Sequence, residues 1–135
     1  ELIKMDLEII KIAEDTNNNK DIKNHTHCSK LKNHLCGDEI QIKLIVKNKK
    51  IIKFGYEGKS CVYCLAAASL LSKVSIDKEI IKINELCDDS KTFFEGNSKI
   101  TDKWKIMRKL FKEKNQSRKE CILLPFKAVK KIVSL

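Results

Sequence analysis

The chain has 135 residues, 42% of them hydrophobic, which is enough for one domain with a single core and no disulfide staples. Its 28 lysines and arginines exceed its 18 aspartates and glutamates, and this net charge of +10 predicts acidic partners. Lysine far outnumbers arginine, so we do not expect nucleic-acid binding from charge alone. No apolar run reaches the roughly 18 residues that span a bilayer, so we expect no membrane partner.

The six cysteines bear on whether the protein works in an oxidising or a reducing compartment. Nothing reads as a signal peptide, although the start at Glu1 suggests that a natural beginning has been trimmed. We therefore expect a reducing compartment, the cytoplasm or an organelle matrix. There, clustered cysteines bind metal or catalyse more often than they cross-link.

The first half of the chain predicts one helix and three strands. Apolar residues at helical spacing indicate a helix over residues 2–13, and the polar stretch 24–32 is typical of a short edge strand. Alternating residues over 40–46, a turn at 47–50 and a second apolar run over 51–56 predict a hairpin.

The second half is predicted to be helical. The alanine-rich run after Cys61 favours a helix, a second is expected over residues 77–87 before a break at 88–90, and apolar spacing over 104–111 indicates a third. A terminal helix is predicted over 122–135. It should begin close to Cys121, because proline at position 125 is comfortable only in a first helical turn. The chain is therefore predicted to be an α+β domain over residues 1–135, with a small antiparallel sheet of about three strands packed against several helices.

Three cysteines and one aspartate stand where loops meet these elements. Asp38 closes the segment Asn-His-Leu-Cys-Gly-Asp at 33–38, which contains Cys36, while Cys61 and Cys121 begin predicted helices. A helix amino terminus lowers a thiol pKa and favours the thiolate. Three thiolates and a carboxylate form a plausible four-coordinate shell for zinc or for iron in a cluster.

Three blocks of the sequence resemble the family of NifU N-terminal, IscU and SufU iron–sulfur cluster assembly proteins. Residues 33–38 resemble the family's Asn-x-x-Cys-Gly-Asp, residues 58–69 resemble its second cysteine and the small-residue helix that follows, and residues 118–128 resemble its third cysteine at the start of the terminal helix. The family's hairpin lies between the first two blocks.

The resemblance implies a SufE/NifU-like fold that gathers Cys36, Asp38, Cys61 and Cys121 at one end. In the family these positions hold a transient 2Fe-2S cluster or a zinc ion. Cys121 and Cys61 are implied as acceptors of persulfide sulfur from a cysteine desulfurase of the SufS, IscS or NifS type, and the product passes to recipient apo iron–sulfur proteins. The hard carboxylate among soft thiolates is implied to keep the site labile.

The departures from the family pattern place the chain nearer SufU-like members. Glu120 stands where IscU-type members have a histidine before the third cysteine, and their Leu-Pro-Pro-Val-Lys motif is missing from this sequence. The amino-terminal part lacks the aromatic and Asn-Pro-Arg signature that is typical of both IscU-type and SufU-like members, so the chain is expected to be a divergent member. Arg118 and Lys119 are either solvated or stabilise the Cys121 thiolate, as a basic residue near that cysteine does in SufU-like members.

Cys64 is additional to this pattern. One turn beyond Cys61, it is predicted to join a metal shell, exchange sulfur with Cys61 or pack beneath the site, and packing is slightly favoured. Packing is also favoured for Cys87. A second zinc site at Cys28 with His25 and His27 is not favoured, because no matching ligand pair follows at finger-like spacing.

Two other functions compete with a scaffold. Cys61 and Cys64 could serve a thiol–disulfide oxidoreductase, but a thioredoxin-like site needs a βαβ setting and a proline opposite its dithiol. The only proline, Pro125, belongs to the predicted last helix. A basic nucleic-acid module with a structural zinc would bind in a salt-sensitive way and gives no role to the Cys-Gly-Asp turn. His34 is expected to face solvent, and Trp104 and Phe111 are expected in the core.

Overall fold

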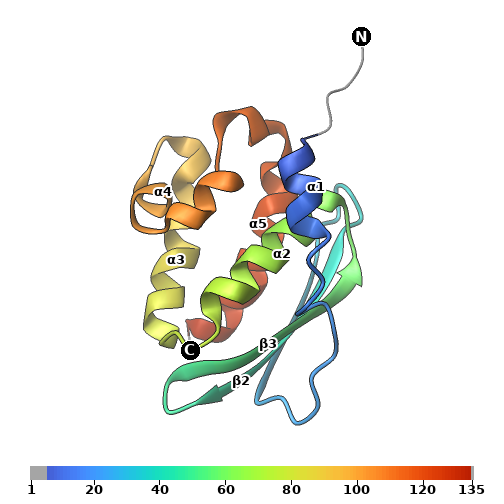
Figure 1. Cartoon of the computed structure of the whole chain (residues 1–135), viewed down its shortest axis with the longest axis vertical. Helices are drawn as coiled ribbons and strands as arrows, with labels where there is room; N and C mark the ends of the chain where they lie inside the picture. Colours follow the sequence, from blue (N-terminus) through green and yellow to red (C-terminus); the bar gives the residue numbers. More distant parts are fainter. Residues whose placement is uncertain (1–5, 135) are drawn as a thin grey trace.

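The structure, a computed structural model, describes residues 6–134, so the part of the predicted first helix that falls on residues 2–5 lies outside the described residues. Within these described residues, three strands and five α-helices make up the fold, with short 3-10 helices between α3 and α5 (Figure 1). Their bounds are α1 Leu7–Ala13, β1 His27–Lys32, β2 Glu39–Lys47, β3 Lys50–Lys59, α2 Val62–Ser75, α3 Ile80–Thr92, η1 Phe93–Glu95, α4 Lys99–Lys103, η2 Lys105–Lys109, η3 Glu113–Arg118 and α5 Lys119–Val133.

The three strands form one antiparallel sheet in the order β1-β2-β3. The β2–β3 turn contains Asn48 and Lys49, whose φ angles of 52° and 63° are those of a tight hairpin turn that matches the strand twist. Alternate residues of β2, namely Ile40, Ile42 and Leu44, are fully buried. The predicted edge strand and hairpin are therefore confirmed.

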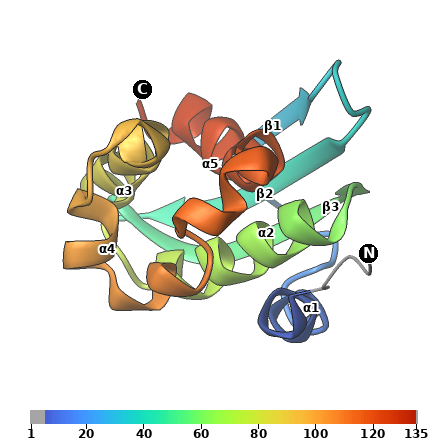
Figure 2. The ribbon, with the colours of Figure 1, turned by 90° about the horizontal axis from the view of Figure 1, so that it is seen from above.

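The helices cover one face of this sheet. Figures 1 and 2 show α2 and α5 lying over the strands, with α1 beside α2 and α3 beside α5. Helix α5 packs on β1 and β2, whereas α2 packs on β3. The predicted α+β fold is confirmed, and no helix among residues 6–134 is both long and apolar enough to cross a membrane.

Aromatic rings fill the space between the helices. Phe111 packs edge-on against Phe93 and against Phe126 of α5, with ring centroids 5.3 and 5.4 Å apart. Phe111 lies in the core, as predicted, but Trp104 is only half-buried at its edge.

Helix α3 differs from its predicted limits. It begins at Ile80 and continues to Thr92, so the break expected at residues 88–90 is wrong. Within the helix the Ser90 hydroxyl donates to the carbonyl of Cys87 at 2.6 Å, and Asp88 pairs with Lys130 of α5 at 2.7 Å. Tertiary contacts with α5 therefore outweigh the weak helix propensity of these polar residues.

The segment before α5 also departs from the prediction. Residues 104–111 form the 3-10 helix η2 and a turn rather than an α-helix, although Met107, Leu110 and Phe111 are buried as the spacing requires. Helix α5 begins at Lys119, close to Cys121 as predicted. Pro125 nevertheless lies beyond its first turn, so the prediction that this proline belongs to the first turn is wrong. A proline here cannot donate the helical hydrogen bond to the carbonyl of Cys121.

Candidate functional site

The loop at residues 33–38 is closed on itself by backbone hydrogen bonds. The Asn33 N–H donates to the Asp38 carbonyl at 2.7 Å, and the Gly37 N–H donates to the Asn33 carbonyl at 2.8 Å. Gly37 has a φ of +80°, a conformation that costs glycine little and other residues more. The loop leaves Cys36 exposed and turns Asp38 inward, where its side chain is buried.

Asp38 joins this loop to the start of α2. Its Oδ1 accepts a hydrogen bond from the backbone N–H of Cys61 at 3.1 Å. Its Oδ2 is buried and has no hydrogen-bond partner among the described residues. A buried carboxylate oxygen without a partner is costly unless something else, such as a bound cation, satisfies it.

Three of the four predicted site residues converge. One ligand atom each from Cys36, Asp38 and Cys121 lies within 4.8 Å of the others, close enough to surround one ion. Cys36 and Asp38 come from the loop before β2, and Cys121 comes from the first turn of α5. Cys61, the N-cap of α2, stands outside that group of three but is close enough to Cys121 to raise the pKa of the Cys121 thiol.

The surroundings of Cys121 keep its thiol neutral in the metal-free chain. Burial raises the pKa of Cys121, and the neighbouring Cys61 and Asp38 raise that pKa further. A cation in this position would reverse the effect, because thiolate and carboxylate ligands would then face a positive charge. Binding would release the thiol proton, so metal affinity would rise with pH.

Cys64 lies beneath these residues and has no exposed surface. Burial raises the pKa of Cys64 to about 12, and Asp38, Cys61 and Cys36 are close enough to raise the pKa as well. The burial of Cys64 agrees with the packing role that the sequence slightly favoured. The side chains near it are nevertheless those of the predicted site, namely Asp38, Cys61 and Cys36.

Two further side chains frame the site. The Arg118 guanidinium lies over the ring of Tyr63, 5.3 Å from the ring centroid, so it joins the start of α5 to the first turn of α2. Sequence reasoning missed Tyr63, because only the fold brings this ring next to Arg118. Glu120, in the position of the family histidine, is exposed and pairs with Lys127 at 3.4 Å.

The other candidates lie outside the group of metal-capable residues found in the described part of the chain. Cys28 is exposed on β1 and accepts a hydrogen bond from the Gln41 side chain at 3.4 Å, and His25 is also exposed. Cys87 is buried, so of the core and surface packing that the sequence left open for it the structure has the first. His34 faces solvent, as predicted.

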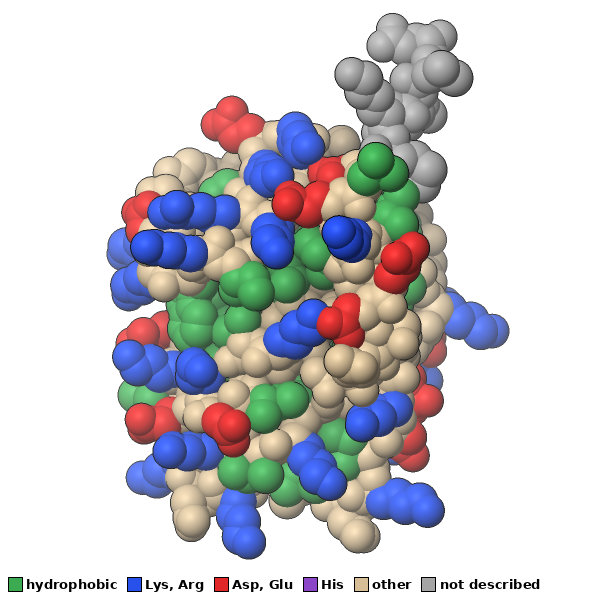
Figure 3. Space-filling view, in the orientation of Figure 1, with side chains coloured by type: hydrophobic (Ala, Val, Ile, Leu, Met, Phe, Trp, Pro, Cys, Tyr) green, Lys and Arg blue, Asp and Glu red, His purple; other side chains and the backbone are tan. Residues whose placement is uncertain are grey.

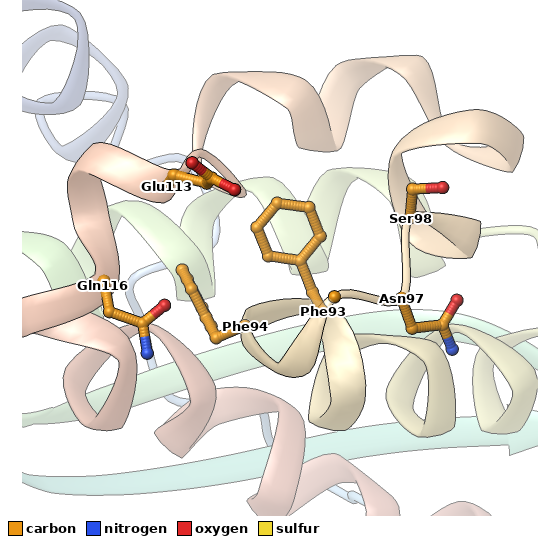
Figure 4. Close-up of a pocket in the computed structure, with 7 residues that line it drawn as sticks. Phe93, Phe94, Asn97, Ser98, Glu113 and Gln116 are labelled. Carbon is orange, nitrogen blue, oxygen red and sulfur yellow. The ribbon is translucent and has the colours of Figure 1, made fainter.

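A separate hollow of about 350 Å³ lies on the helical side of the molecule. Figure 4 shows Phe93 and Phe94 projecting between Glu113 and Gln116 of η3 on one side and the turn that contains Asn97 on the other. None of the four predicted site residues lines it.

On the face shown in Figure 3, lysines and arginines are scattered with acidic side chains between them.

Comparison with known proteins gives consistent matches. The model of the family described as NifU-like N terminal domain matches residues 6–130. The chain is 30% identical over 130 residues to an uncharacterized protein of Borreliella burgdorferi, covering 96% of this chain and 82% of that protein. It is 30% identical over 100 residues to the iron-sulfur cluster assembly scaffold protein IscU of Thermotoga maritima, covering 73% and 70% of the two chains.

Solved structures show the same fold at lower sequence identity. A putative iron-sulfur cluster assembly scaffold protein for the SUF system from Fervidobacterium islandicum aligns with a TM-score of 0.84 at 20% identity, covering 94% of both chains. The N-terminal part of a nitrogen-fixing NifU-like protein from Brucella abortus aligns with a TM-score of 0.81 at 18% identity, covering 96% of this chain and 91% of that one.

Proposed function

The chain belongs to the NifU-like N terminal domain family, and on this premise we propose that it is a scaffold on which iron–sulfur clusters are assembled. The observation that carries the proposal is the convergence of Cys36, Asp38 and Cys121 within 4.8 Å. One of the two solved structures named above is described as a putative iron-sulfur cluster assembly scaffold protein.

In the proposed site, Cys36, Asp38, Cys61 and Cys121 bind the cargo, which is iron and sulfide or a zinc ion. Asp38 fits this role because its Oδ2 is buried without a partner among the described residues while its Oδ1 is already held by Cys61. Soft thiolates suit iron in clusters and zinc alike, so the donor set admits both. The carboxylate is the weakest donor to a soft cluster and favours release.

Sulfur would reach the site as persulfide from a cysteine desulfurase, and the product would leave to recipient apo proteins. Cys121 and Cys61 are the proposed acceptors. Their neighbouring thiols allow a sulfane sulfur to pass from one to the other by exchange. We further propose that residues 1–135 act as a single domain of this kind.

Two features argue against thiol–disulfide exchange as the main function. Cys61 and Cys64 do stand at a helix amino terminus, but the sheet before α2 is an antiparallel hairpin rather than a βαβ unit. Cys64 is also fully buried, with a pKa raised by burial to about 12, so an external disulfide cannot reach it readily.

The test is the metal and acid-labile sulfide content of the chain purified without air and after reconstitution with iron and sulfide. We expect Cys36→Ala, Cys61→Ala and Cys121→Ala each to lose most of the metal. Cys64→Ala and the matched control Cys28→Ala, which removes an exposed thiol on β1, should retain it. Sulfide in the native protein would distinguish a cluster from zinc.

Two results would contradict the proposal. One is a native chain that binds neither metal nor cluster after reconstitution. The other is equal metal content in all five variants, because the bound ion would then lie elsewhere.

A further inference from the structure

Cys64 stands in the right place to react with Cys61. Cys61 is the N-cap of α2, and its carbonyl accepts the first helical hydrogen bond from the Leu65 N–H at 3.0 Å. Residues three apart in such a turn have Cα atoms about 5 Å from each other. This separation falls within the roughly 4.4–6.8 Å that a disulfide requires.

The direction of the Cys64 side chain favours the same partner. In a helix each Cα–Cβ bond tilts toward the amino terminus, so the side chain of Cys64 leans toward the end of α2 that Cys61 caps. Asp38, Cys61 and Cys36 all lie close enough to Cys64 to act on its charge. Cys64 therefore belongs to the site.

The exposure of the two thiols differs. Cys64 has no exposed surface, whereas Cys61 is partly exposed. Another protein can therefore deliver sulfur to Cys61 but cannot reach Cys64, whose reactions are limited to side chains of its own site.

The proposed function leaves one chemical requirement open. A desulfurase delivers sulfur as persulfide, in which the outer sulfur is at the oxidation level of elemental sulfur, but a cluster contains sulfide. Two electrons must therefore be supplied for each sulfur. Resting on the proposed function, we propose that Cys64 supplies these electrons by attacking a persulfide on Cys61 and releasing sulfide into the site.

The chain itself supplies the atoms, the proton and the two electrons of this step. The Cys64 Sγ forms a bond to the Cys61 Sγ, and the bond between that Sγ and the outer sulfur breaks. The outer sulfur leaves as hydrosulfide and takes the proton of the Cys64 thiol, so the products are H₂S and a Cys61–Cys64 disulfide. The outer sulfur is reduced by two electrons, and the two cysteine sulfurs are oxidised to the disulfide. An external dithiol must then reduce the disulfide before another round.

The test follows sulfide release from the metal-free chain of 135 residues, loaded with persulfide by sodium polysulfide without air. After removal of the polysulfide, free sulfide is measured over time and tryptic peptides are weighed. Cleavage after Lys59 and Lys73 places Cys61 and Cys64 in one peptide, residues 60–73. In the native chain we expect one free sulfide for each persulfide on Cys61, and a 60–73 peptide that has lost the extra sulfur and two hydrogen atoms.

Cys64→Ala should keep the persulfide on the same peptide and release sulfide at least about tenfold more slowly, until dithiothreitol is added. Cys87→Ala is the matched control, because Cys87 is also buried with a pKa raised by burial to about 12 but lies on α3. This variant should behave as the native chain does. Circular dichroism checks that both variants fold.

The inference is overturned if Cys64→Ala releases sulfide at the native rate, if the native chain keeps its persulfide, or if the disulfide joins different cysteines. Reconstitution with iron and inorganic sulfide separates this failure from failure of the proposed function, because inorganic sulfide bypasses Cys64. Cys64→Ala should then assemble a cluster as the native chain does. If the native chain assembles none from inorganic sulfide, the scaffold proposal itself fails.

Discussion

Asp38 has two separate tasks in the proposed site, and each of its oxygens serves one. Oδ1 is bonded to the Cys61 N–H, which holds the loop before β2 against the start of α2. Oδ2 is buried without a hydrogen-bond partner among the described residues, and one oxygen of the carboxylate lies within 4.8 Å of the Cys36 and Cys121 thiols. A substitution of Asp38 can therefore change both the position of the loop and the binding of the cargo.

Asp38→Ala removes the hard ligand and leaves the cluster to the thiolates alone, which should slow cluster loss to a chelator by about tenfold, because thiolates are softer donors than a carboxylate. Asp38→Asn is the matched variant, since its amide oxygen can still accept from the Cys61 N–H. The measurement is the decay of cluster absorbance after reconstitution. Slower decay in both variants supports a ligand role for the carboxylate. A change in Asp38→Ala alone would assign Asp38 a structural role instead.

At the scale of elements, the pairing of β2 with β3 positions two of the site segments. Asp38 immediately precedes β2, and β3 leads to Cys61. Gly58 is paired with Ile40 near this end of the hairpin, and a Cβ added to Gly58 would lie 2.0 Å from the carbonyl oxygen of Glu39. Since a backbone atom cannot move aside as a flexible side chain can, the two strands would have to separate.

Gly58→Ala should therefore lower the free energy of unfolding by about 2 kcal/mol. It should also reduce metal content, because Asp38 and Cys61 would move apart. Urea unfolding and metal analysis measure the two effects, and Glu57→Ala, an exposed change on the same strand, is the control. Native stability in Gly58→Ala would show that the strands accommodate the methyl group and that the contact does not set their spacing.

Local patterns predicted some elements and not others. The hairpin and the helix after Cys61 were predictable because strand alternation, turn residues and the alanine-rich run all indicate the same structure. The extension of α3 through Asp88 and Ser90 was not, because it depends on contacts with α5 such as the pair of Asp88 with Lys130. Pro125 was misleading for a similar reason, since packing tolerates it inside the helix.

At the scale of the whole molecule, basic side chains outnumber acidic ones, and on the face shown in Figure 3 they are interspersed with acidic side chains. Ion pairs among the described residues, such as Lys30 with Glu39 and Lys112 with Glu8, join exposed side chains and add little to the stability of the fold. The net charge of +10 therefore acts mainly on encounters with other molecules.

Association with a desulfurase that presents an acidic face should thus depend strongly on salt. Raising the ionic strength from about 0.05 M to about 0.5 M should slow association by at least tenfold while dissociation changes little, because screening weakens long-range attraction. Stopped-flow or surface-based kinetics with the purified pair measures both rates. A salt-independent association rate would mean that the net charge has no part in recognising this partner.

The convergence of the site also belongs to this scale. The sequence predicted the four residues from their places at element boundaries and from family resemblance. It could not predict that Cys36, Asp38 and Cys121 form the tighter group while Cys61 stands beside them, because this depends on how α5 packs against the sheet. Nor could it place Arg118 over Tyr63.

The cysteines of the proposed site differ in their access to water, from exposed Cys36 through partly exposed Cys61 to buried Cys121. An incoming thiol of a recipient protein meets Cys36 first and Cys121 last. Handover of the cargo would therefore follow an order set by the fold, with the bond to Cys36 exchanged early and the bond to Cys121 broken late. Leu35, which is 91% exposed beside Cys36, stands where the recipient would arrive.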